Sequence, residues 1–418
     1  MRVAELTTAA RFVTGIYTER ARTLWAARVG GDLFSQLNVQ PATTNPYPIY
    51  EAMRKAGPLL RTRLGNYSTT SYAVSKDVVR NRRFGVVPSL ESGQQTSRDF
   101  LDLSLLNLDP PDHTRLRRLA GPGFSPKRME AYVPLVNAAV HEVLDDAERQ
   151  GRFDLMSTVA SPLPIAVITR LLGLPDDDPV RLRRLGSTIA KALDGIWSLS
   201  QARQLAAAEK ELRGVFDTLV AEKVRHPGND LTSTLIADGG GALTTEELMP
   251  LVRLLLVAGF ETTVNAIGNG VRWLLADRTQ WELLVADPSR AEQVAEEVLR
   301  FDPPVQATAR VAREDVEVAG QLVGRDQWVI TLLAAANRDP EVYPDPNRFD
   351  ITREAPVEHL AFSGGIHYCL GSPLARMELV QTFRALAERF PGLRSTGPVT
   401  MRHATTLRGP LSVPLTVR

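Results

Sequence analysis

The chain has 418 residues, of which 44% are hydrophobic and 23% are charged, and its formal net charge at pH 7 is +1. These values are typical of a globular protein, and the balanced charge creates no field that would attract nucleic acid or an acidic membrane. The single cysteine excludes an internal disulfide and favours a reducing, cytoplasmic location. Because no repeat, low-complexity run or long linker interrupts the sequence, we expect one unit over 1–418.

The N-terminal region gives the weakest signals. Residues 5–34 predict an amphipathic helix with several arginines, and they lack the apolar core of a signal peptide. We expect this helix to pack on the body of the protein, with loose contact to a membrane surface as the alternative. Residues 1–44 are therefore treated as an extension of uncertain packing. A weak β pattern follows at 72–79.

Helical periodicity dominates the middle of the chain. Segments 125–150 and 200–226 predict long helices, the first of which begins with a Ser-Pro start. Thr244 and Glu247 have the spacing of a capping box, and the helix that they begin would run to Asp277. Its middle is apolar nearly all round, yet it is interrupted by charged residues. A buried core helix is therefore expected there, and not a membrane span.

The β signals lie mainly in the C-terminal third. Residues 317–336 contain short β-rich runs broken by turns, and residues 409–417 add one further strand pattern. Between them, residues 337–362 are rich in Pro, Asp and Asn and predict a long irregular segment, which in compact proteins is usually functional. The fold class expected from these patterns is mainly α with a small β region.

The stretch "HLAFSGGIHYCLGSPLAR" (359–376) contains the single cysteine, Cys369. A lone cysteine is usually a small buried apolar residue. Here glycines surround it, and Ser372 and Pro373 resemble the cap and first position of a helix, which would favour the thiolate. A nucleophile would need an oriented histidine base, and a zinc site would need three more ligands. One thiolate is sufficient for haem, because the porphyrin supplies four further bonds.

The loop resembles the haem-thiolate signature of the cytochrome P450 family. The matching pattern is Phe362-x-x-Gly365-x-His367-x-Cys369-x-Gly371. The resemblance implies that Cys369 is the fifth ligand of the iron in haem b (iron protoporphyrin IX). It also implies that Phe362 packs beside the sulfur and that His367 meets a haem propionate. Ser363 departs from the family, which usually has glycine immediately after the phenylalanine.

A second stretch, "EEVLR", is followed later by "PNRF". Glu297 and Arg300 are three residues apart on one helix face and can form an ion pair. Such a pair usually lies on the surface and contributes little. It also resembles the Glu-x-x-Arg motif of the same family, which implies a structural triad completed by Arg348 beneath the haem loop.

A third stretch, "AGFETT", lies in the middle of the long apolar helix and includes Ala258 and Gly259. Glu261 and Thr262 place an acid and an alcohol in an apolar span, where a carboxylate is costly without a partner, water or a function. The stretch resembles the oxygen-activation motif of the family. That implies contact of Ala258 and Gly259 with haem, proton relay by Glu261, and a hydrogen bond from Thr262 to oxygen, with O2 as co-substrate.

Basic residues elsewhere extend the resemblance. His113 and Arg117, in "DPPDHTRLRR", share one helix face and can clamp an anion, although a solvated basic surface is the simpler interpretation. In the family this pair binds a haem propionate, and Arg310 matches another propionate-binding arginine. Arg115 and Arg118 lie on the opposite face, where they would contact an acidic electron donor or remain solvated.

Together these motifs identify the chain as a member of the cytochrome P450 family, of the soluble bacterial type. The resemblance implies haem held between the long helix and the cysteine loop. It also implies that one oxygen atom of O2 is inserted into a C–H or C=C bond of a fairly large apolar molecule such as a polyketide, macrolide, terpenoid or lipid. Because no flavin or iron–sulfur motif is present, electrons would come from a ferredoxin and an NAD(P)H-dependent ferredoxin reductase. A monomer is expected.

Substrate selection is assigned to less distinctive regions. Residues 82–107 are expected to form a variable loop over the pocket, and residues 165–200 a lid. The side chains expected to line the pocket are Leu254, Ala258, Val305, Gln306 and Ala307. Three other functions stay open: a non-catalytic haem sensor, a peroxide-dependent haem-thiolate enzyme, which would not need the acid–alcohol pair, and a cysteine hydrolase without haem.

Overall fold

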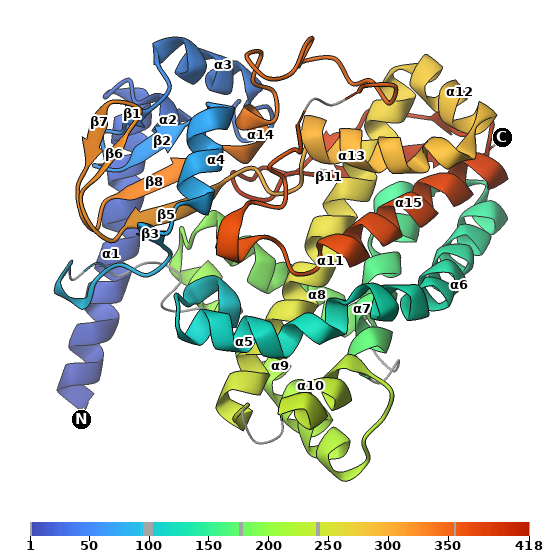
Figure 1. Ribbon diagram of the computed structural model, residues 1–418, viewed down its shortest axis with the longest axis horizontal. Coiled ribbons are helices and arrows are strands. Elements are labelled where there is room, and N and C mark those ends of the chain that lie inside the picture. The colour runs from blue at the N-terminus through green and yellow to red at the C-terminus, as the bar shows by residue number, and fades with distance from the viewer. Residues whose placement is uncertain are drawn as a thin grey trace.

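A helix of 32 residues, α11 (Thr245–Ala276), crosses the centre of the computed structural model (Figure 1). The structure describes residues 2–92, 94, 103–174, 179–239, 243–354 and 357–417. The capping box predicted for α11 is present, because the Thr244 side chain accepts from the Glu247 amide while the Glu247 carboxylate accepts from the Thr244 amide. In the described residues this is the one helix long and apolar enough to cross a membrane. Of its most apolar 18-residue window, 83% is buried inside the protein, as expected for a core helix.

The other helices surround α11 (Figure 1). Longer helices are α1 (Arg2–Arg28), α3 (Tyr47–Ala56), α4 (Tyr72–Arg80), α5 (Asp112–Ala120), α6 (Pro126–Gln150), α7 (Pro162–Leu172), α8 (Pro179–Lys191), α9 (Leu199–Arg225), α10 (Leu231–Gly239), α12 (Arg278–Ala286), α13 (Ala291–Phe301) and α15 (Ser372–Arg389). Short helical turns are α2 (Leu33–Gln36), η1 (Leu90–Ser92), η3 (Ser104–Asn107), η4 (Gly121–Phe124), η5 (Met156–Ala160), η6 (Ala192–Asp194), η7 (Pro288–Arg290), α14 (Leu333–Ala336) and η8 (Gly365–His367).

The β structure is small and lies mostly to one side of the helices (Figure 1). Its strands are β1 (Leu60–Arg61), β2 (Tyr67–Thr69), β3 (Phe84–Gly85), β4 (Arg152–Asp154), β5 (Thr308–Ala312), β6 (Val316–Val318), β7 (Gln321–Val323), β8 (Trp328–Thr331), β9 (Arg394–Ser395), β10 (Thr400–Met401), β11 (Pro410–Ser412) and β12 (Pro414–Thr416). The main sheet has the order β1-β2-β8-β5-β3, in which β2 and β8 are parallel and the other pairs are antiparallel. The expected mainly α fold with a small β region is confirmed.

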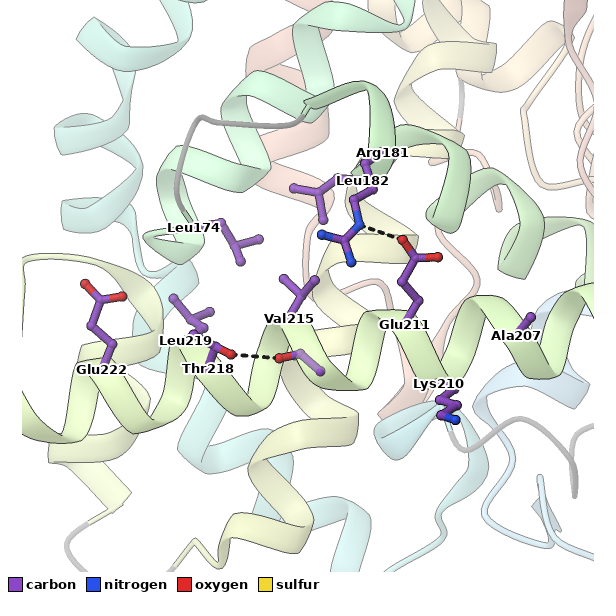
Figure 2. Close-up of a pocket in the computed structure, with 11 residues that line it drawn as sticks. Leu174, Arg181, Leu182, Ala207, Lys210, Glu211, Val215, Thr218, Leu219 and Glu222 are labelled. Carbon is purple, nitrogen blue, oxygen red and sulfur yellow. Dashed lines mark hydrogen bonds and ion pairs between the residues drawn. The ribbon is translucent and has the colours of Figure 1, made fainter.

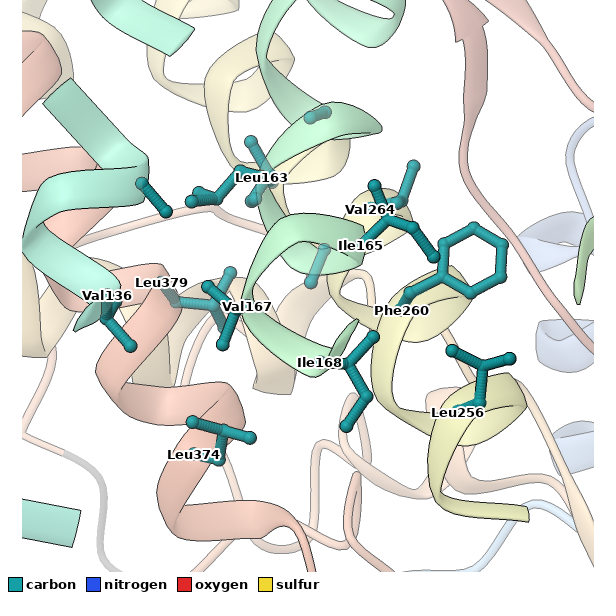
Figure 3. Packing of buried hydrophobic residues seen from close by; sticks show 14 of the residues in the cluster. Val136, Leu163, Ile165, Val167, Ile168, Leu256, Phe260, Val264, Leu374 and Leu379 are labelled. Atoms are coloured by element: carbon teal, nitrogen blue, oxygen red, sulfur yellow. The ribbon is translucent and has the colours of Figure 1, made fainter. Parts of the chain in front are cut away.

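The main core forms where α6, α7, α11 and α15 meet (Figure 3). Side chains from these helices interdigitate there: Val136, Leu163, Ile165, Val167, Ile168, Leu256, Phe260, Val264, Leu374 and Leu379. Each fully buried side chain of this kind contributes about 1.5–3 kcal/mol from the hydrophobic effect. The core therefore fixes α11 against α15, the helix that follows the cysteine loop, and so sets the distance between the two parts of the predicted site.

A buried carboxylate, Asp302, connects distant segments behind α13. Its oxygens accept hydrogen bonds from the Tyr47 hydroxyl at 2.8 Å, the Trp273 indole at 3.0 Å and Arg408 at 2.9 Å, and Arg272 completes an ion pair. Burial raises the pKa of Asp302, but the surrounding guanidinium groups lower the pKa by more. The pKa therefore lies well below the usual range of a carboxyl group. Asp302 thus joins α3, α11 and the segment between β10 and β11.

Three local expectations are corrected by the fold. Residues 72–79, assigned to a weak strand, lie in α4, where Ser71 caps the first turn and buried side chains recur at helical spacing. The alanine-rich end of the 317–336 region forms α14, and the rest contains β6, β7 and β8. The N-terminal helix exists as α1, but its N-terminal end projects from the body (Figure 1), while Tyr17 and Trp25 are exposed. Contact with the body is made by the face of α1 that carries the buried Thr23, Ala26 and Ala27.

Candidate active site

The cysteine loop is folded tightly against α4. The Cys369 amide donates to the Phe362 carbonyl at 3.0 Å, which closes the loop on itself. Gly365 has a φ of +64°, and a Cβ placed on it would lie 2.5 Å from the Val79 carbonyl oxygen. Only glycine fits this position without strain, because the left-handed conformation and the close approach of α4 both exclude a side chain.

Replacing Gly365 by alanine is expected to destabilise the haem-free protein by about 1–3 kcal/mol, from backbone strain and overpacking. Gly371 offers a matched control in the same loop, because its φ is −84° and a built Cβ meets nothing within 4 Å. Urea unfolding followed by circular dichroism measures both variants. Equal destabilisation by Gly365→Ala and Gly371→Ala would show that contact with α4 does not determine the loop.

The thiol of Cys369 is only partly exposed, and its environment differs from the expectation. Burial raises the pKa of Cys369 above its ordinary value, while the amides of Gly371 and Ser372 and the charge of Arg117 lower it by less. The helix also begins differently, because Gly371 is the N-cap of α15 and Ser372 is its first residue. The protein environment alone therefore favours the thiol, and metal coordination would be needed to keep the thiolate.

Four cationic or hydrogen-bonding groups predicted from distant segments converge on this loop. The imidazoles of His113 and His367 lie 4.2 Å apart between ring centroids. Arg117 donates to the Tyr368 carbonyl at 2.5 Å, and Arg310 donates to the Ser363 hydroxyl at 3.2 Å. The chain therefore gathers donors from α5, β5 and the cysteine loop at one place.

Unsatisfied polar atoms among these residues suit a porphyrin that carries two carboxylates. His113 is 1% exposed, and neither of its ring nitrogens has a hydrogen-bond partner among the described residues. Nε2 of His367 lies 3.8 Å from the Asp109 carboxylate, beyond hydrogen-bond distance. Buried polar groups without partners are costly in a folded protein, so two carboxylates at this place would satisfy the histidine nitrogens that have no partner within the described ranges.

The buried histidine also predicts a pH dependence of stability. Burial, with help from His367 and Arg117, lowers the pKa of His113 to about 4, whereas an unfolded histidine titrates near 6.5. Between these values the unfolded chain binds more protons, so the free energy of unfolding of the haem-free protein should rise with pH and then level off. The slope attributable to His113 is at most about 1.4 kcal/mol per pH unit.

Urea unfolding between pH 4 and 7 measures this slope. His113→Gln should reduce it, whereas the matched change His141→Gln, at an exposed position on α6, should leave it unaltered. If the pH dependence of His113→Gln matched that of the unsubstituted protein, His113 would not be the group responsible.

The acid–alcohol pair lies on α11, as predicted, but the acid is fully engaged. Glu261 is 2% exposed, forms an ion pair with Arg402 and accepts a hydrogen bond from the Ser187 hydroxyl at 3.0 Å. The Thr262 hydroxyl donates to the Ala258 carbonyl at 2.8 Å, which leaves its oxygen lone pairs able to accept. Arg402 and Ser187 therefore hold the orientation of the Glu261 carboxylate, one on each oxygen.

The two small residues before the acid have different surroundings. Ala258 is exposed although most of α11 is buried, and it precedes the half-buried Thr262 by one turn on the same face. At Gly259 a built Cβ would lie 3.1 Å from Cδ1 of Ile168. Gly259 thus allows α7 to approach α11 closely, whereas Ala258 faces the accessible side that the predicted cofactor would need.

The expected structural triad contains a different third residue. Arg300 binds both carboxylate oxygens of Glu297 at 2.7 Å, and both side chains are buried. The side chain of Arg348 is 65% exposed, and Arg300 contacts only the backbone carbonyl of Arg348, which accepts a hydrogen bond at 3.1 Å. Arg353 lies 3.4 Å from the Glu297 carboxylate instead. The assignment of Arg348 is therefore wrong, and Arg353 takes its place.

The residues expected to line a substrate pocket divide into two groups. Val305 and Ala307 are half-buried and stay candidates, while Leu254 is 7% exposed and belongs to the main core. The prediction that Gln306 lines the pocket is wrong, because the residue is buried and its side-chain amide already makes two hydrogen bonds. It donates to the Pro303 carbonyl at 2.7 Å and accepts from the Tyr50 hydroxyl at 3.2 Å.

Arg115, expected either to contact an acidic electron donor or to remain solvated, forms an ion pair with Glu247 at the start of α11. Arg118, on the same helix, is exposed. The side chain of Arg115 stays about one-third exposed, so the ion pair with Glu247, and not burial, distinguishes it from Arg118. The pair formed by Arg115 instead ties α5 to the first turn of α11.

The two segments expected to cover the pocket, the loop 82–107 and the lid 165–200, agree only in part with the structure. Residues 165–172 belong to the buried part of α7, so the proposed lid is limited to α8 and the turn after it. The centre of the 82–107 loop lies outside the described residues, while β3, η1 and η3 mark its two ends. A groove of about 660 Å³ separates α8 from α9 and is lined by Leu174, Leu182, Val215 and Leu219 (Figure 2). None of the predicted haem or acid–alcohol residues lines this groove.

Several contacts that define the site could not be found from motif spacing. Asp109 holds the amides of Val86 and Val87 at 3.1 Å and pairs with Arg313. Burial raises the pKa of Asp109, but the nearby imidazole of His367 and the ion pair with Arg313 outweigh this effect and bring the pKa to about 2. Its position before two prolines suggested only a helix start. Arg402, which pairs with Glu261 across 141 residues, has no sequence signal at all.

Known proteins share this fold and these motifs. The cytochrome P450 family model matches residues 291–403. Cytochrome P450 140 of Mycobacterium tuberculosis is 40% identical over 412 residues, covering 93% of this chain and 92% of the relative. 6-Deoxyerythronolide B hydroxylase of Saccharopolyspora erythraea is 38% identical over 318 residues, covering 75% of this chain and 77% of the relative. The crystal structure of myxobacterial cytochrome P450 CYP267B1 with myristic acid has a TM-score of 0.83 at 33% identity, covering 92% of this chain and 99% of that one.

A mainly helical fold with a cysteine loop beneath a long central helix, together with these similarities, defines the class. The chain belongs to the cytochrome P450 family. Within that family it is of the bacterial type and, like its named relatives, a monooxygenase of the oxidoreductase class.

Proposed function

We propose that the protein binds haem b through the Cys369 thiolate and hydroxylates or epoxidises a fairly large apolar molecule. Two electrons and two protons would accompany each O2, so that one oxygen atom enters a C–H or C=C bond and the other leaves as water. The observation that carries this proposal is the convergence of Cys369 with Arg117, Arg310 and His113, whose ring nitrogens have no hydrogen-bond partner in the described part of the chain. In the family, bound haem supplies the redox chemistry that cleaves O2.

The chain's own residues would bind, orient and move protons around that group. Arg117, Arg310, His113 and His367 would hold its two carboxylates by charge-assisted hydrogen bonds. Thr262, whose hydroxyl already donates to Ala258, can accept a hydrogen bond from water or a reactant. Glu261 would pass protons toward Thr262 from the side where Arg402 and Ser187 hold its carboxylate.

The substrate class is supported by the apolar lining and by the relatives. Ala258, Val305 and Ala307 offer small, uncharged surfaces beside the site. One relative is named for hydroxylation of 6-deoxyerythronolide B, and a solved neighbour contains myristic acid. We therefore propose a macrolide-sized or lipid-like substrate. Electrons would come from a ferredoxin and its NAD(P)H-dependent reductase, with the enzyme acting as a cytoplasmic monomer.

Turnover under ¹⁸O₂ tests this function. The haem-loaded protein is mixed with NAD(P)H, a ferredoxin and its reductase, and either 6-deoxyerythronolide B or myristic acid. Mass spectrometry should detect a product that carries one ¹⁸O atom. Product formed only from added hydrogen peroxide would favour the peroxide-dependent alternative. Ligand binding without turnover of either probe would favour the haem sensor.

A further inference from the structure

Ser363 adopts a backbone conformation that its side chain disfavours. Its φ is +60°, in the left-handed region that glycine enters freely and other residues enter at a cost of about 1–2 kcal/mol. The amide of Ser363 donates to the Leu360 carbonyl at 2.8 Å, so the turn itself is made by the backbone. Glycine would make the same turn without strain. The serine side chain is therefore not explained by the shape of the loop.

The serine hydroxyl contacts one of the two arginines at the site. Nη2 of Arg310 donates to Oγ of Ser363 at 3.2 Å. Nη1 of the same guanidinium donates to the Thr308 hydroxyl at 3.1 Å and to the Ala309 carbonyl at 2.9 Å, both on its own strand β5. Arg310 is 4% exposed. The contact with Ser363 is thus a hydrogen bond that fixes this buried cation relative to the cysteine loop.

A hydroxyl suits this position for a chemical reason. Because its oxygen accepts from Arg310, its own proton is still available to an acceptor such as a carboxylate. A buried guanidinium loses less rotational freedom on binding an anion when its orientation is already fixed. The serine would therefore improve anion binding by Arg310 without adding a charge.

We propose that Ser363 is a positioning residue, which orients Arg310 toward a haem carboxylate and thereby sets the retention and reduction potential of the haem. This inference rests on the proposed function, because it requires that the protein bind haem at this loop. A fixed positive charge near the haem favours the reduced form, since reduction adds an electron. Loss of the hydroxyl should weaken haem retention and lower the potential.

Two substitutions separate this role from backbone strain. Ser363→Gly removes the hydroxyl and relieves the strain, whereas Ser363→Ala removes the hydroxyl and keeps the strain. Thermal unfolding of the haem-free proteins should show the glycine variant at least as stable as the unsubstituted protein and the alanine variant less stable. Haem loss to an excess of apomyoglobin and the midpoint potential should instead change alike in both variants.

We expect haem loss to be about three to ten times faster in both variants. In both variants the preference for ferrous over ferric haem should be about threefold smaller than in the unsubstituted protein. At 59 mV per tenfold change this corresponds to a midpoint potential about 28 mV lower. In an Arg310→Gln background, Ser363→Gly should have no further effect on either quantity. That background tests whether the serine acts through the arginine.

Three outcomes would overturn the inference, and only one of them would also overturn the proposed function. If the unsubstituted protein binds haem but Ser363→Gly keeps its haem-loss rate and potential, the positioning role is wrong while the proposed function stands. If the unsubstituted protein takes up no haem, both fail together. If the midpoint potentials of the glycine and alanine variants changed in step with the stabilities of their haem-free forms, Ser363 would likewise have a purely structural role.

Discussion

Replacing Arg300 by methionine should lower the free energy of unfolding by about 3–5 kcal/mol, the usual cost of breaking a buried ion pair. Arg300 is 2% exposed and makes two hydrogen bonds to Glu297. It also donates to the carbonyls of Asn337 and Pro346, both at 3.0 Å, and of Arg348 at 3.1 Å. Methionine keeps much of the volume but leaves a buried carboxylate and three carbonyls without these donors. Urea unfolding followed by circular dichroism measures the effect.

The nearby arginines provide graded controls for this prediction. Arg348→Met changes an exposed side chain whose nearest acidic partner, Asp350, lies 3.8 Å away, so the expected change is within about 0.5 kcal/mol. Arg353→Met should be intermediate, at about 1–3 kcal/mol, because Arg353 contacts Glu297 and donates to loop carbonyls. If Arg348→Met were as damaging as Arg300→Met, Arg348 would be the third residue of the triad after all.

The second large effect is expected in turnover. Thr262→Ala should leave substrate binding nearly unchanged but separate electron use from product formation, because the alcohol that accepts a hydrogen bond near the reacting oxygen is lost. We expect product per NAD(P)H consumed to fall at least tenfold, with the missing electrons recovered as hydrogen peroxide or water. Positioned proton donors and acceptors of this kind typically contribute 10²–10⁴-fold.

The neighbouring Thr263 supplies the matched control, because it is also a threonine of α11 but is buried and lies 3.4 Å from the Gly259 carbonyl. Thr263→Ala should keep the coupling of the unsubstituted enzyme. Glu261→Gln should lower the turnover rate more than the coupling, since Arg402 would lose its buried carboxylate partner and proton transfer would slow. Unchanged coupling in Thr262→Ala would exclude the proposed role of the alcohol.

Local signals in the sequence were sufficient for the parts of the molecule that are determined locally. The capping box of Thr244 and Glu247 begins α11 at the expected residue, and the Ser-Pro start of residues 125–150 begins α6. The cysteine loop, the histidine–arginine pair of α5 and the acid–alcohol pair were identified from short motifs. Such features depend on neighbours within about one helical turn, and the sequence states those neighbours directly.

Features that depend on distant segments could not be predicted in the same way. The partner of Glu261 is Arg402, 141 residues away, and the choice of Arg353 over Arg348 depends on how an irregular loop turns. Gln306 is expected in the pocket together with its neighbours Val305 and Ala307, and only its hydrogen bond with the distant Tyr50 shows that its side chain is used elsewhere. Residues 72–79 have β-branched side chains, yet the Ser71 cap and burial against the sheet favour a helix.

Carbon monoxide binding to the reduced protein tests the central claim most directly. The purified protein is supplied with haem, reduced, exposed to carbon monoxide and examined at its Soret band, in parallel with Cys369→Ser. Thiolate ligation by Cys369 predicts the red-shifted band typical of cytochromes P450 in the unsubstituted protein and its absence in the variant. A protein that stays colourless, or a Cys369→Ser variant that keeps the same band, would contradict the assignment of Cys369 as the iron ligand.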